Sequence, residues 1–435
     1  MNIEEALIFM KSHKCYQDAV NFTYDSENFN LKRFKNFLKD YGLDFKGIKF
    51  FHVGGSKGKG SVATFLAEYL KELGKDVGLF TSPFITDIRE SFWINGEIIS
   101  EKHFCDSVER LRDYLDNHPN LGITYFELLT ALVLEYFIER GVEYAVMEVG
   151  LGGRLDSTNV ISPELSILST IEKEHTAVLG ETYQEIISEK LGIVKEGVPV
   201  VVGFQNQEVR KIMEHQFKAN ENIIWAEDLV DIQKSKFNGS SYNVDFKVGD
   251  DFFEDVIISG INKAMIKNVT VTLLGLRKYF GSLEEKCLRA VSSKYVIRGR
   301  MQLIELKDGK KIILDMAHTK ESINNLMDSL DEVYGQRRYV FLLSFLKDKN
   351  VAEMLEQIED RAEKIVFCKS HQKRSFGVDE LNSFIKNQEI EFFNEADIKK
   401  ALKKSIDLLK YKEILIVTGS HFLVGEVLIK LNSLV

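Results

Sequence analysis

Short apolar runs alternate with longer amphipathic runs along most of this 435-residue chain. Continuous short apolar runs are typical of buried strands, whereas apolar residues that repeat every three or four positions indicate helices. The helical pattern covers residues 62–73, 126–137 and 182–195, and the strand pattern covers residues 48–53, 77–80, 144–149, 165–169 and 198–203. This alternation predicts a mostly parallel sheet covered by helices.

The pattern changes twice in the second half of the chain. Residues 231–255 are polar and rich in Gly, Ser, Asn and Asp, which favours antiparallel strands joined by turns. A new series of strand and helix patterns begins after Arg300, with strands predicted at residues 311–314, 339–343, 364–368 and 414–418. We therefore predict two α/β domains, one of residues 1–297 and a smaller one of residues 298–435.

Composition agrees with two domains and excludes some classes of protein. A chain of this length exceeds the size at which one hydrophobic core usually stops growing. The 57 basic and 66 acidic residues give a net charge of −9, which disfavours a nucleic-acid-binding surface. The four cysteines form no CxxC spacing and fit reduced thiols in a cytoplasmic protein. The first 20 residues contain no long apolar block, so neither a signal peptide nor a membrane span is expected.

A run rich in glycine and lysine, GGSKGKGS, occupies residues 54–61 between the first predicted strand and the first predicted helix. Backbone amides at a helix N-terminus attract anions, and glycines let a phosphate approach the backbone closely. This order predicts a phosphate-binding loop of P-loop type, with Lys59 at a terminal phosphate and Ser61 at a magnesium ion. The run departs from the strict Walker pattern because Gly60 separates the lysine from the serine. A tight turn with solvated lysines is the alternative.

Two further polar segments follow predicted strands. Glu148 ends one strand before a glycine-rich turn, where open α/β sheets bind ligands, so it is a candidate magnesium ligand; a capped strand end is the alternative. His175 follows the strand at residues 165–169. A lone histidine is more often structural than a ligand, but its place after a sheet strand favours function. The helical pattern 182–195 then carries Lys190 within the sequence EKLGIVK.

Together these segments resemble the folylpolyglutamate synthase and dihydrofolate synthase family, the folate branch of the Mur ligase superfamily. The resemblance rests on GKGS at residues 58–61, EVGLGGRLDSTN at residues 148–159 and EKLGIVK at residues 189–195, in this order. It extends from about Phe50 to the C-terminus. It implies an ATP-binding α/β domain of P-loop type, followed by a smaller, Rossmann-like glutamate-ligase domain.

The resemblance also implies an activity. An ATP-dependent ligase of this family adds L-glutamate to a folate-type acceptor, here a tetrahydrofolate polyglutamate, dihydropteroate or both. The acceptor carboxylate attacks the γ-phosphate of ATP, and the amino group of glutamate then displaces phosphate from the acyl phosphate.

The resemblance also implies a function for each residue of this chain that matches a family motif. These family roles place the ATP phosphates at Gly58, Lys59, Gly60 and Ser61, and Mg²⁺ at Ser61, Glu148, His175 and Lys190. Lys190 would act as a carbamate, because an unmodified lysine cannot ligate magnesium. Lys195 is expected to be an ordinary cation at the end of the helix.

The C-terminal part matches two further family motifs. RGRMQ at residues 298–302 resembles the Pro-Gly-Arg motif, in which Arg300 would contact ATP phosphates. DMAH at residues 315–318 resembles the Asp-Gly-Ala-His motif, in which Asp315 and His318 would face the nucleotide. Asn268 is all that remains of an adenine-side His-Gln-x-x-Asn motif. The expected catalytic residues are Lys59, Lys190 and His318.

The departures from the family concern the acceptor more than ATP. Lys57 adds a cation to the phosphate loop where the family has asparagine, and Glu174 replaces an aspartate. In the loop after residues 81–83, Phe84, Phe92 and Trp93 could stack on a flat heterocycle or pack the loop against the sheet. A superfamily ligase for a different carboxylate is therefore the alternative, while the retained ATP-site residues disfavour a nucleotide-binding switch without ligase activity. We expect a monomer with no nucleic-acid or membrane partner.

Overall fold

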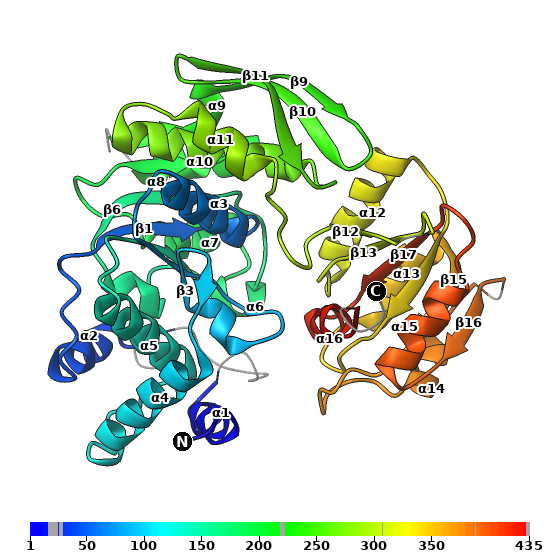
Figure 1. Ribbon diagram of the computed structural model, residues 1–435, viewed down its shortest axis with the longest axis horizontal. Helices are drawn as coiled ribbons and strands as arrows, with labels where there is room; N and C mark the ends of the chain where they lie inside the picture. The colour runs from blue at the N-terminus through cyan, green and yellow to red at the C-terminus, as the bar shows by residue number, and fades with distance from the viewer. Residues whose placement is uncertain (16–24, 26–28, 218–221, 307, 388, 432–435) are drawn as a thin grey trace.

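The computed structural model describes residues 1–15, 25, 29–217, 222–306, 308–387 and 389–431. These residues form three sheets with helices packed around them (Figure 1). The first sheet has the order β4-β3-β2-β5-β1-β6-β7-β8, and all of its strands are parallel except the hairpin β3-β4 at one edge. Its strands are β1 (Lys49–Gly54), β2 (Val77–Phe80), β3 (Trp93–Ile94), β4 (Glu97–Ile98), β5 (Tyr144–Glu148), β6 (Pro163–Leu168), β7 (Val200–Val202) and β8 (Ile223–Trp225).

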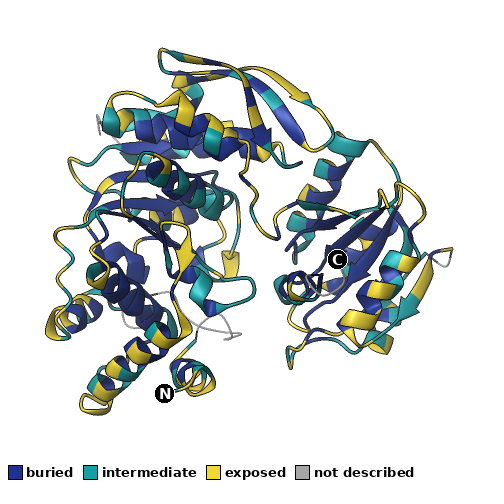
Figure 2. Ribbon diagram, viewed as in Figure 1, coloured by how far each residue is buried: buried dark blue, intermediate teal, exposed yellow. Residues whose placement is uncertain are grey.

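Helices cover both faces of this sheet, so its central strands are buried (Figure 2). Side chains alternate between the faces: Phe51 and Val53 join one apolar cluster, and Phe50 joins the other. The first face packs against α3 (Lys59–Glu72), α10 (Ala264–Phe280) and α11 (Glu285–Ser292). The second packs against α1 (Ile3–Ser12), α2 (Leu31–Asp40), α4 (Glu101–Asp116) and α5 (Tyr125–Glu139). Shorter or peripheral helices are α6 (Thr176–Leu179), α7 (Tyr183–Leu191), α8 (Gln207–Phe217) and α9 (Ala226–Leu229).

The second sheet is antiparallel and lies over α10 and α11 in Figure 1. It consists of β9 (Val230–Phe237), β10 (Ser241–Val248) and β11 (Asp251–Ser259), and its inward residues belong to the same apolar cluster as α3. The antiparallel strands predicted for residues 231–255 are therefore confirmed. A polar outer face and an apolar inner face are what a sheet covered on one side requires.

The third sheet has the order β12-β13-β17-β14-β15-β16 and is parallel except for the edge strand β12. Its strands are β12 (Gln302–Glu305), β13 (Lys311–Leu314), β14 (Tyr339–Leu343), β15 (Ala362–Phe367), β16 (Glu391–Asn394) and β17 (Ile414–Thr418). One face packs against α12 (Lys320–Tyr334) and α13 (Val351–Glu359), with α14 (Val378–Leu381) nearby, and the other against α15 (Ile398–Asp407) and α16 (His421–Leu431). No helix among the described residues is long and apolar enough to cross a membrane.

The predicted α/β class, with a mostly parallel first sheet and a second parallel-rich sheet, is confirmed. The sequence pattern missed β3, β4, β8, β12 and β16, which are short and lie at or near sheet edges. The division between residues 297 and 298 stays a prediction.

One helix prediction was too long. Helix α7 ends at Leu191, where Arg154 N donates to Glu189 O at 2.7 Å in the last turn, and Gly192 leaves room for the backbone of Arg154. Lys195 therefore lies beyond the helix, and its expected role as a helix-end cation is wrong. Its Nζ instead donates to Asn159 Oδ1 at 2.6 Å and ties this segment to the turn after β5.

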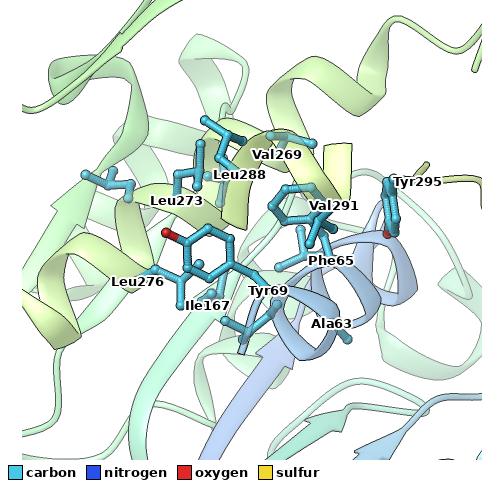
Figure 3. Close-up of a cluster of buried hydrophobic side chains, with 14 of the residues drawn as sticks. Ala63, Phe65, Tyr69, Ile167, Val269, Leu273, Leu276, Leu288, Val291 and Tyr295 are labelled. Carbon is cyan, nitrogen blue, oxygen red and sulfur yellow. The ribbon is translucent and has the colours of Figure 1, made fainter. Parts of the chain in front are cut away.

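Helix α3 is held in place by its inner face (Figure 3). Phe65 and Tyr69 are buried against α10 and α11, and the Tyr69 hydroxyl both donates to Glu284 O at 3.1 Å and accepts from Glu284 N at 2.7 Å. These contacts fix the start of α3, which carries the end of the glycine-lysine loop.

Replacing Phe65 by alanine would leave a cavity under α3, so we expect the free energy of unfolding to fall by about 3–5 kcal/mol. Phe252 on β11 is 52% exposed, which makes Phe252→Ala a matched control with an expected change within about 0.5 kcal/mol. Urea unfolding followed by circular dichroism measures both. Equal losses in the two variants would contradict the packing assigned to Phe65.

Candidate active site

Four strand ends meet at one edge of the first sheet. Strands β2, β5, β1 and β6 are neighbours and run parallel, so the segments that follow them leave the sheet on the same side. The segments are the loop after β2, Glu148 with its glycine-rich turn, the glycine-lysine loop, and residues 169–175. The topology thus brings together every segment that the sequence singled out in this part of the chain.

The glycine-lysine loop joins β1 directly to α3. Gly58 is the N-cap residue, with φ of 88° in the left-handed region, and no side chain of the described residues caps the helix. A side chain at Gly58 would come within 2.7 Å of Asn268 Oδ1, so α10 closes one side of the loop and places Asn268 beside it. The amides at the start of α3 therefore remain available to an anion.

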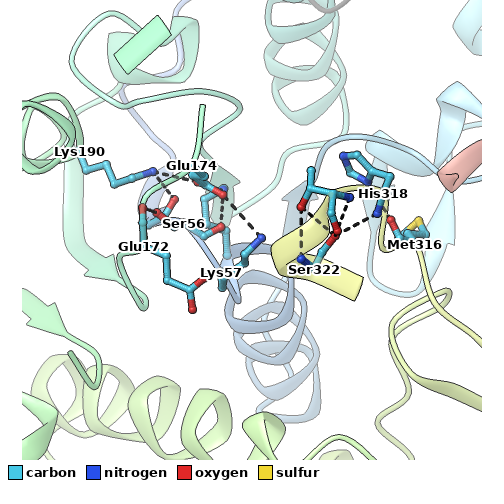
Figure 4. Close-up of polar contacts among 11 residues, drawn as sticks. Ser56, Lys57, Glu172, Glu174, Lys190, Met316, His318 and Ser322 are labelled. Atoms are coloured by element: carbon cyan, nitrogen blue, oxygen red, sulfur yellow. Dashed lines mark hydrogen bonds and ion pairs between the residues drawn. The ribbon is translucent and has the colours of Figure 1, made fainter. Parts of the chain in front are cut away.

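Three ammonium groups surround the carboxylate of Glu174 beside this loop (Figure 4). Lys190 Nζ lies 3.2 Å from Glu174 Oε1, and the ammonium nitrogens of Lys57 and Lys59 each lie 4.0 Å from a Glu174 oxygen. Burial alone raises the pKa of Glu174, but the charges of Lys59 and Lys190 outweigh it and lower that pKa to about 2. One carboxylate thus faces three cations, and the excess positive charge suits phosphate oxygens.

Lys190 is almost completely buried near the end of α7. Its Nζ also donates to Gly55 O at 2.8 Å. Burial, assisted by the charge of Lys59, lowers the pKa of this amine to about 8. At neutral pH a larger fraction of it is unprotonated than of an exposed lysine, and the unprotonated amine is the form that reacts with CO₂ to give a carbamate.

Glu148 ends β5 with its carboxylate buried against the glycine-lysine loop. Ser82 N donates to Glu148 Oε2 at 3.0 Å, and a Cβ at Gly60 would lie 3.4 Å from both carboxylate oxygens. Burial raises the pKa of Glu148 to about 7, although the charge of Lys59 opposes the shift. A buried carboxylate that forms no ion pair with any described residue fits an oxygen ligand for a hard cation.

The other predicted metal ligands are more open. His175 is exposed at the N-cap of α6, directly after Glu174, and Ser61 lies in the first turn of α3, where its carbonyl accepts a hydrogen bond from the Tyr295 hydroxyl. No three His, Cys, Asp or Glu side chains of the described ranges lie close enough together to hold a metal ion. Magnesium usually takes one or two carboxylates and completes its shell with phosphate oxygens and water. This donor set therefore fits a metal that binds together with a nucleotide.

Asp315 organises the predicted nucleotide-facing residues of the third sheet. It is buried after β13 and accepts hydrogen bonds from the amides of Met301 at 2.8 Å and Ala317 at 2.9 Å. Burial raises the pKa of Asp315, and the charge of Arg300 opposes that shift. The Arg300 charge also opposes the burial-driven rise in the pKa of Glu148, after the larger effect of Lys59, so the exposed arginine lies near carboxylates of both sheets.

His318 and His421 approach each other at the ends of β13 and β17, with ring centroids 6.1 Å apart. His318 Nδ1 lies 2.8 Å from Met316 O. Burial lowers the pKa of both imidazoles, that of His421 to about 4, so both are neutral at neutral pH. The structure thus adds His421 to the neighbourhood of the predicted His318.

The loop after β2 packs its aromatic residues inward. Phe92 is buried, with its ring centroid 5.5 Å from that of Phe104, and Phe84 packs on the same apolar cluster. Trp93 packs on the opposite cluster, where Lys71 Nζ lies 5.9 Å from the ring centroid. Of the two interpretations that the sequence left open, packing is the one that the structure supports.

Sequence reasoning missed the roles of three charged or titratable residues in this region. Glu174 had a usable signal, because an acidic residue beside His175 in a strand-end segment can pair with the loop lysines. His421 had a weaker signal, because it comes three residues after the predicted strand at residues 414–418. Glu90, which pairs with Arg298 at 3.0 Å, had no local signal, because its partner lies 208 residues away.

Two family descriptions match this chain. Residues 53–274 match the Mur ligase middle domain, and residues 299–421 match the Mur ligase glutamate ligase domain. The two matches cover the first sheet from the end of β1 onward and all strands of the third sheet.

Individual relatives match almost the whole chain. A dihydrofolate synthase/folylpolyglutamate synthase of Bacillus subtilis is 28% identical over 432 residues, covering 95% of this chain and 98% of the relative. The crystal structure of folylpolyglutamate synthase from Thermotoga maritima has a TM-score of 0.83 and 30% identity, covering 99% of this chain and 96% of that one. A bifunctional folylpolyglutamate synthase/dihydrofolate synthase from Yersinia pestis, solved with AMPPNP and a Mn ion, shares the fold at a TM-score of 0.80 and 22% identity, covering 99% and 98%. This chain therefore belongs to the folylpolyglutamate synthase/dihydrofolate synthase family of the Mur ligases.

Proposed function

We propose that this chain is an ATP-dependent ligase that adds L-glutamate to a folate-type acceptor. The observation that carries the proposal is the cluster of Lys57, Lys59 and Lys190 around Glu174, next to the buried Glu148 and the uncapped start of α3. A polyphosphate with a divalent cation matches that arrangement of positive charge, open amides and one buried carboxylate.

The proposed nucleotide site draws on both parallel sheets. Gly58, Gly60 and the amides at the start of α3 receive phosphate oxygens, and Lys59 neutralises the terminal phosphate. Asn268 borders this loop from α10. Across from it, Arg300 adds a cation, Asp315 holds the segment that carries Arg300, and the neutral His318 faces the nucleotide.

We further propose that the divalent cation is Mg²⁺, with Ser61, Glu148 and His175 as protein ligands and a carbamate of Lys190 as an additional oxygen donor. The AMPPNP and Mn ion of the Yersinia pestis relative support a nucleotide and a divalent cation. Bound there, the ion would draw electron density from the γ-phosphorus and neutralise the charge that develops on the leaving ADP.

The chemistry follows from carboxylate activation. An oxygen of the acceptor carboxylate forms a bond to the γ-phosphorus, and the bond from that phosphorus to the β–γ bridging oxygen breaks, releasing ADP. The glutamate amino group then attacks the acyl carbon, the carbon–oxygen bond to phosphate breaks, and the nitrogen loses a proton. The ammonium groups of Lys57 and Lys59 and the guanidinium of Arg300 stabilise the negative charge of the transferred phosphoryl group, and exclusion of water from the site would protect the acyl phosphate from hydrolysis.

The acceptor is a reduced folate, dihydropteroate or both, and the aromatic residues of the loop after β2 pack on the apolar clusters of the first sheet. A monomeric state and a cytoplasmic location stay predictions.

The activity itself is the first test. Purified protein with ATP, Mg²⁺ and L-glutamate is expected to release phosphate only when tetrahydrofolate or dihydropteroate is added. A coupled phosphate assay measures the release, and mass spectrometry of the product detects the added glutamate. Release with an unrelated carboxylate, but with neither of these acceptors, would overturn the folate assignment.

The carbamate on Lys190 predicts a dependence on CO₂. Removing dissolved CO₂ should lower the turnover of the wild type, and bicarbonate should restore it, because the carbamate forms reversibly. Lys190→Ala should lose turnover by a factor on the order of 100 and should not respond to bicarbonate. Lys173→Ala is the matched control, since Lys173 is an exposed lysine that lies 5.2 Å from the Tyr183 ring centroid. Intact turnover in Lys190→Ala would refute the role.

The raised pKa of Glu148 predicts that metal binding depends on pH. With a pKa of about 7, much of this carboxyl is protonated in slightly acid solution, and a cation must displace that proton. The affinity for Mg²⁺ with ADP should therefore rise as pH increases through about 7, with proton release. Calorimetry in two buffers of different ionisation enthalpy measures both.

Two variants test whether Glu148 is the source of that pH dependence. Glu148→Gln should bind Mg²⁺ weakly and lose the proton release. Glu164→Gln, at an exposed position of β6, should behave like the wild type. A Glu148→Gln variant with unchanged proton release would contradict the assignment.

A further inference from the structure

The loop after β2 contacts the C-terminal part of the chain at two places, helix α16 and the segment at residues 298–301. Ile85 of this loop packs on the apolar cluster that contains α16, and its carbonyl oxygen lies so close to Gly425 that any side chain there would clash. Figure 1 shows α16 on the side of the third sheet that faces the first. The loop is therefore seated on α16 at a point where only glycine leaves room for the backbone.

Glu90 shapes the same loop from within. Its carboxylate accepts hydrogen bonds from Ile85 N at 2.8 Å, from Thr86 N at 3.3 Å and from the Thr86 hydroxyl. The same carboxylate also accepts a hydrogen bond from Arg298 Nη1 at 3.0 Å. One side chain thus fixes the backbone that reaches α16 and binds the segment at residues 298–301.

That segment is tied to the third sheet by its other bonds. Met316 N donates to Gly299 O at 3.0 Å, and Met301 N donates to Asp315 Oδ2 at 2.8 Å. Gly299 has φ of 65°, and a side chain there would meet Val424 at 3.0 Å, next to the glycine under Ile85. Arg300, the proposed phosphate-binding arginine, lies between these anchored residues.

We propose that Glu90 and Arg298 are positioning residues that hold the acceptor-side loop and the Arg300 segment as one unit. Arg298 is 49% exposed, so the ion pair contributes little to stability by itself. Its effect is geometric, because the pair directly joins two segments that also both contact α16. Losing it leaves Arg300 less well placed for phosphate and leaves the loop less well placed for the acceptor. This inference rests on the proposed ligase function.

Arg298→Ala is the most direct test, because it removes the cross-link and leaves the bonds from Glu90 to its own loop intact. We expect the Kd for ADP, measured by calorimetry without acceptor, and the KM for whichever acceptor the wild type uses to rise together, each by about three- to tenfold. Arg298→Lys should recover part of both effects because it keeps a cation in reach of Glu90.

A control variant tests whether any lost ion pair has the same effect, and a double variant tests whether Glu90 and Arg298 act through the same pair. Arg361 forms a similar pair with Asp331, at 3.0 and 2.6 Å, wholly within the C-terminal part, and Arg361→Ala should leave both constants within about twofold of the wild type. The double variant Glu90→Gln with Arg298→Ala should raise the Kd for ADP no more than the more harmful single change. The reason is that each change breaks the same ion pair between Glu90 and Arg298.

Three outcomes would overturn the coupling. Arg298→Ala could leave both constants unchanged, change only the Kd for ADP, which would make Arg298 a nucleotide contact, or change only the acceptor KM, which would make it a support of the loop alone. Thermal unfolding of each variant checks that none of these effects reflects loss of the fold. A wild type that turns over neither acceptor would instead refute the proposed function.

Discussion

The parallel order of β2, β5, β1 and β6 is the constraint on which the N-terminal half of the site depends. Each strand ends at the same edge, so four segments that lie between residues 54 and 175 come within reach of one another. Parallel strands require helical crossovers, and those helices bury both faces of the sheet. The core of the sheet and the convergence of its loops therefore have one cause.

That convergence brings like charges together, and the structure compensates for it. Lys57, Lys59 and Lys190 would repel one another, and Glu174 reduces that repulsion while leaving an excess of positive charge. Burial also raises the pKa of Glu148 to about 7, so a substantial fraction of this carboxyl is protonated at neutral pH. The site is therefore arranged for a ligand that brings both anions and a cation, as a nucleotide with a divalent metal does.

Much of the fold and part of the site were predictable from the sequence. Central strands such as β2 and β17 were found at their correct bounds, because strands buried on both faces read as continuous apolar runs. Edge strands such as β12 and β16 were missed, because half-exposed short strands lack that pattern. The glycine-lysine loop and Glu148 were found for a related reason: each follows a recognisable strand. The pairing of Glu90 with Arg298 was not found, because neither residue follows a recognisable strand or has its partner nearby in the sequence.

The sequence by itself determined the class of the fold, the family and the chemistry, because local periodicity and short motifs encode them within a few residues. Only the tertiary structure decided how those motifs act together. It showed Glu174 shared by three lysines, Lys190 buried with a lowered pKa, and α7 ending early against Arg154. It also joined Glu90 to Arg298 across 208 positions. The physical reason is that burial, electrostatic field and close approach depend on distance in space, which the order of residues along a chain does not specify.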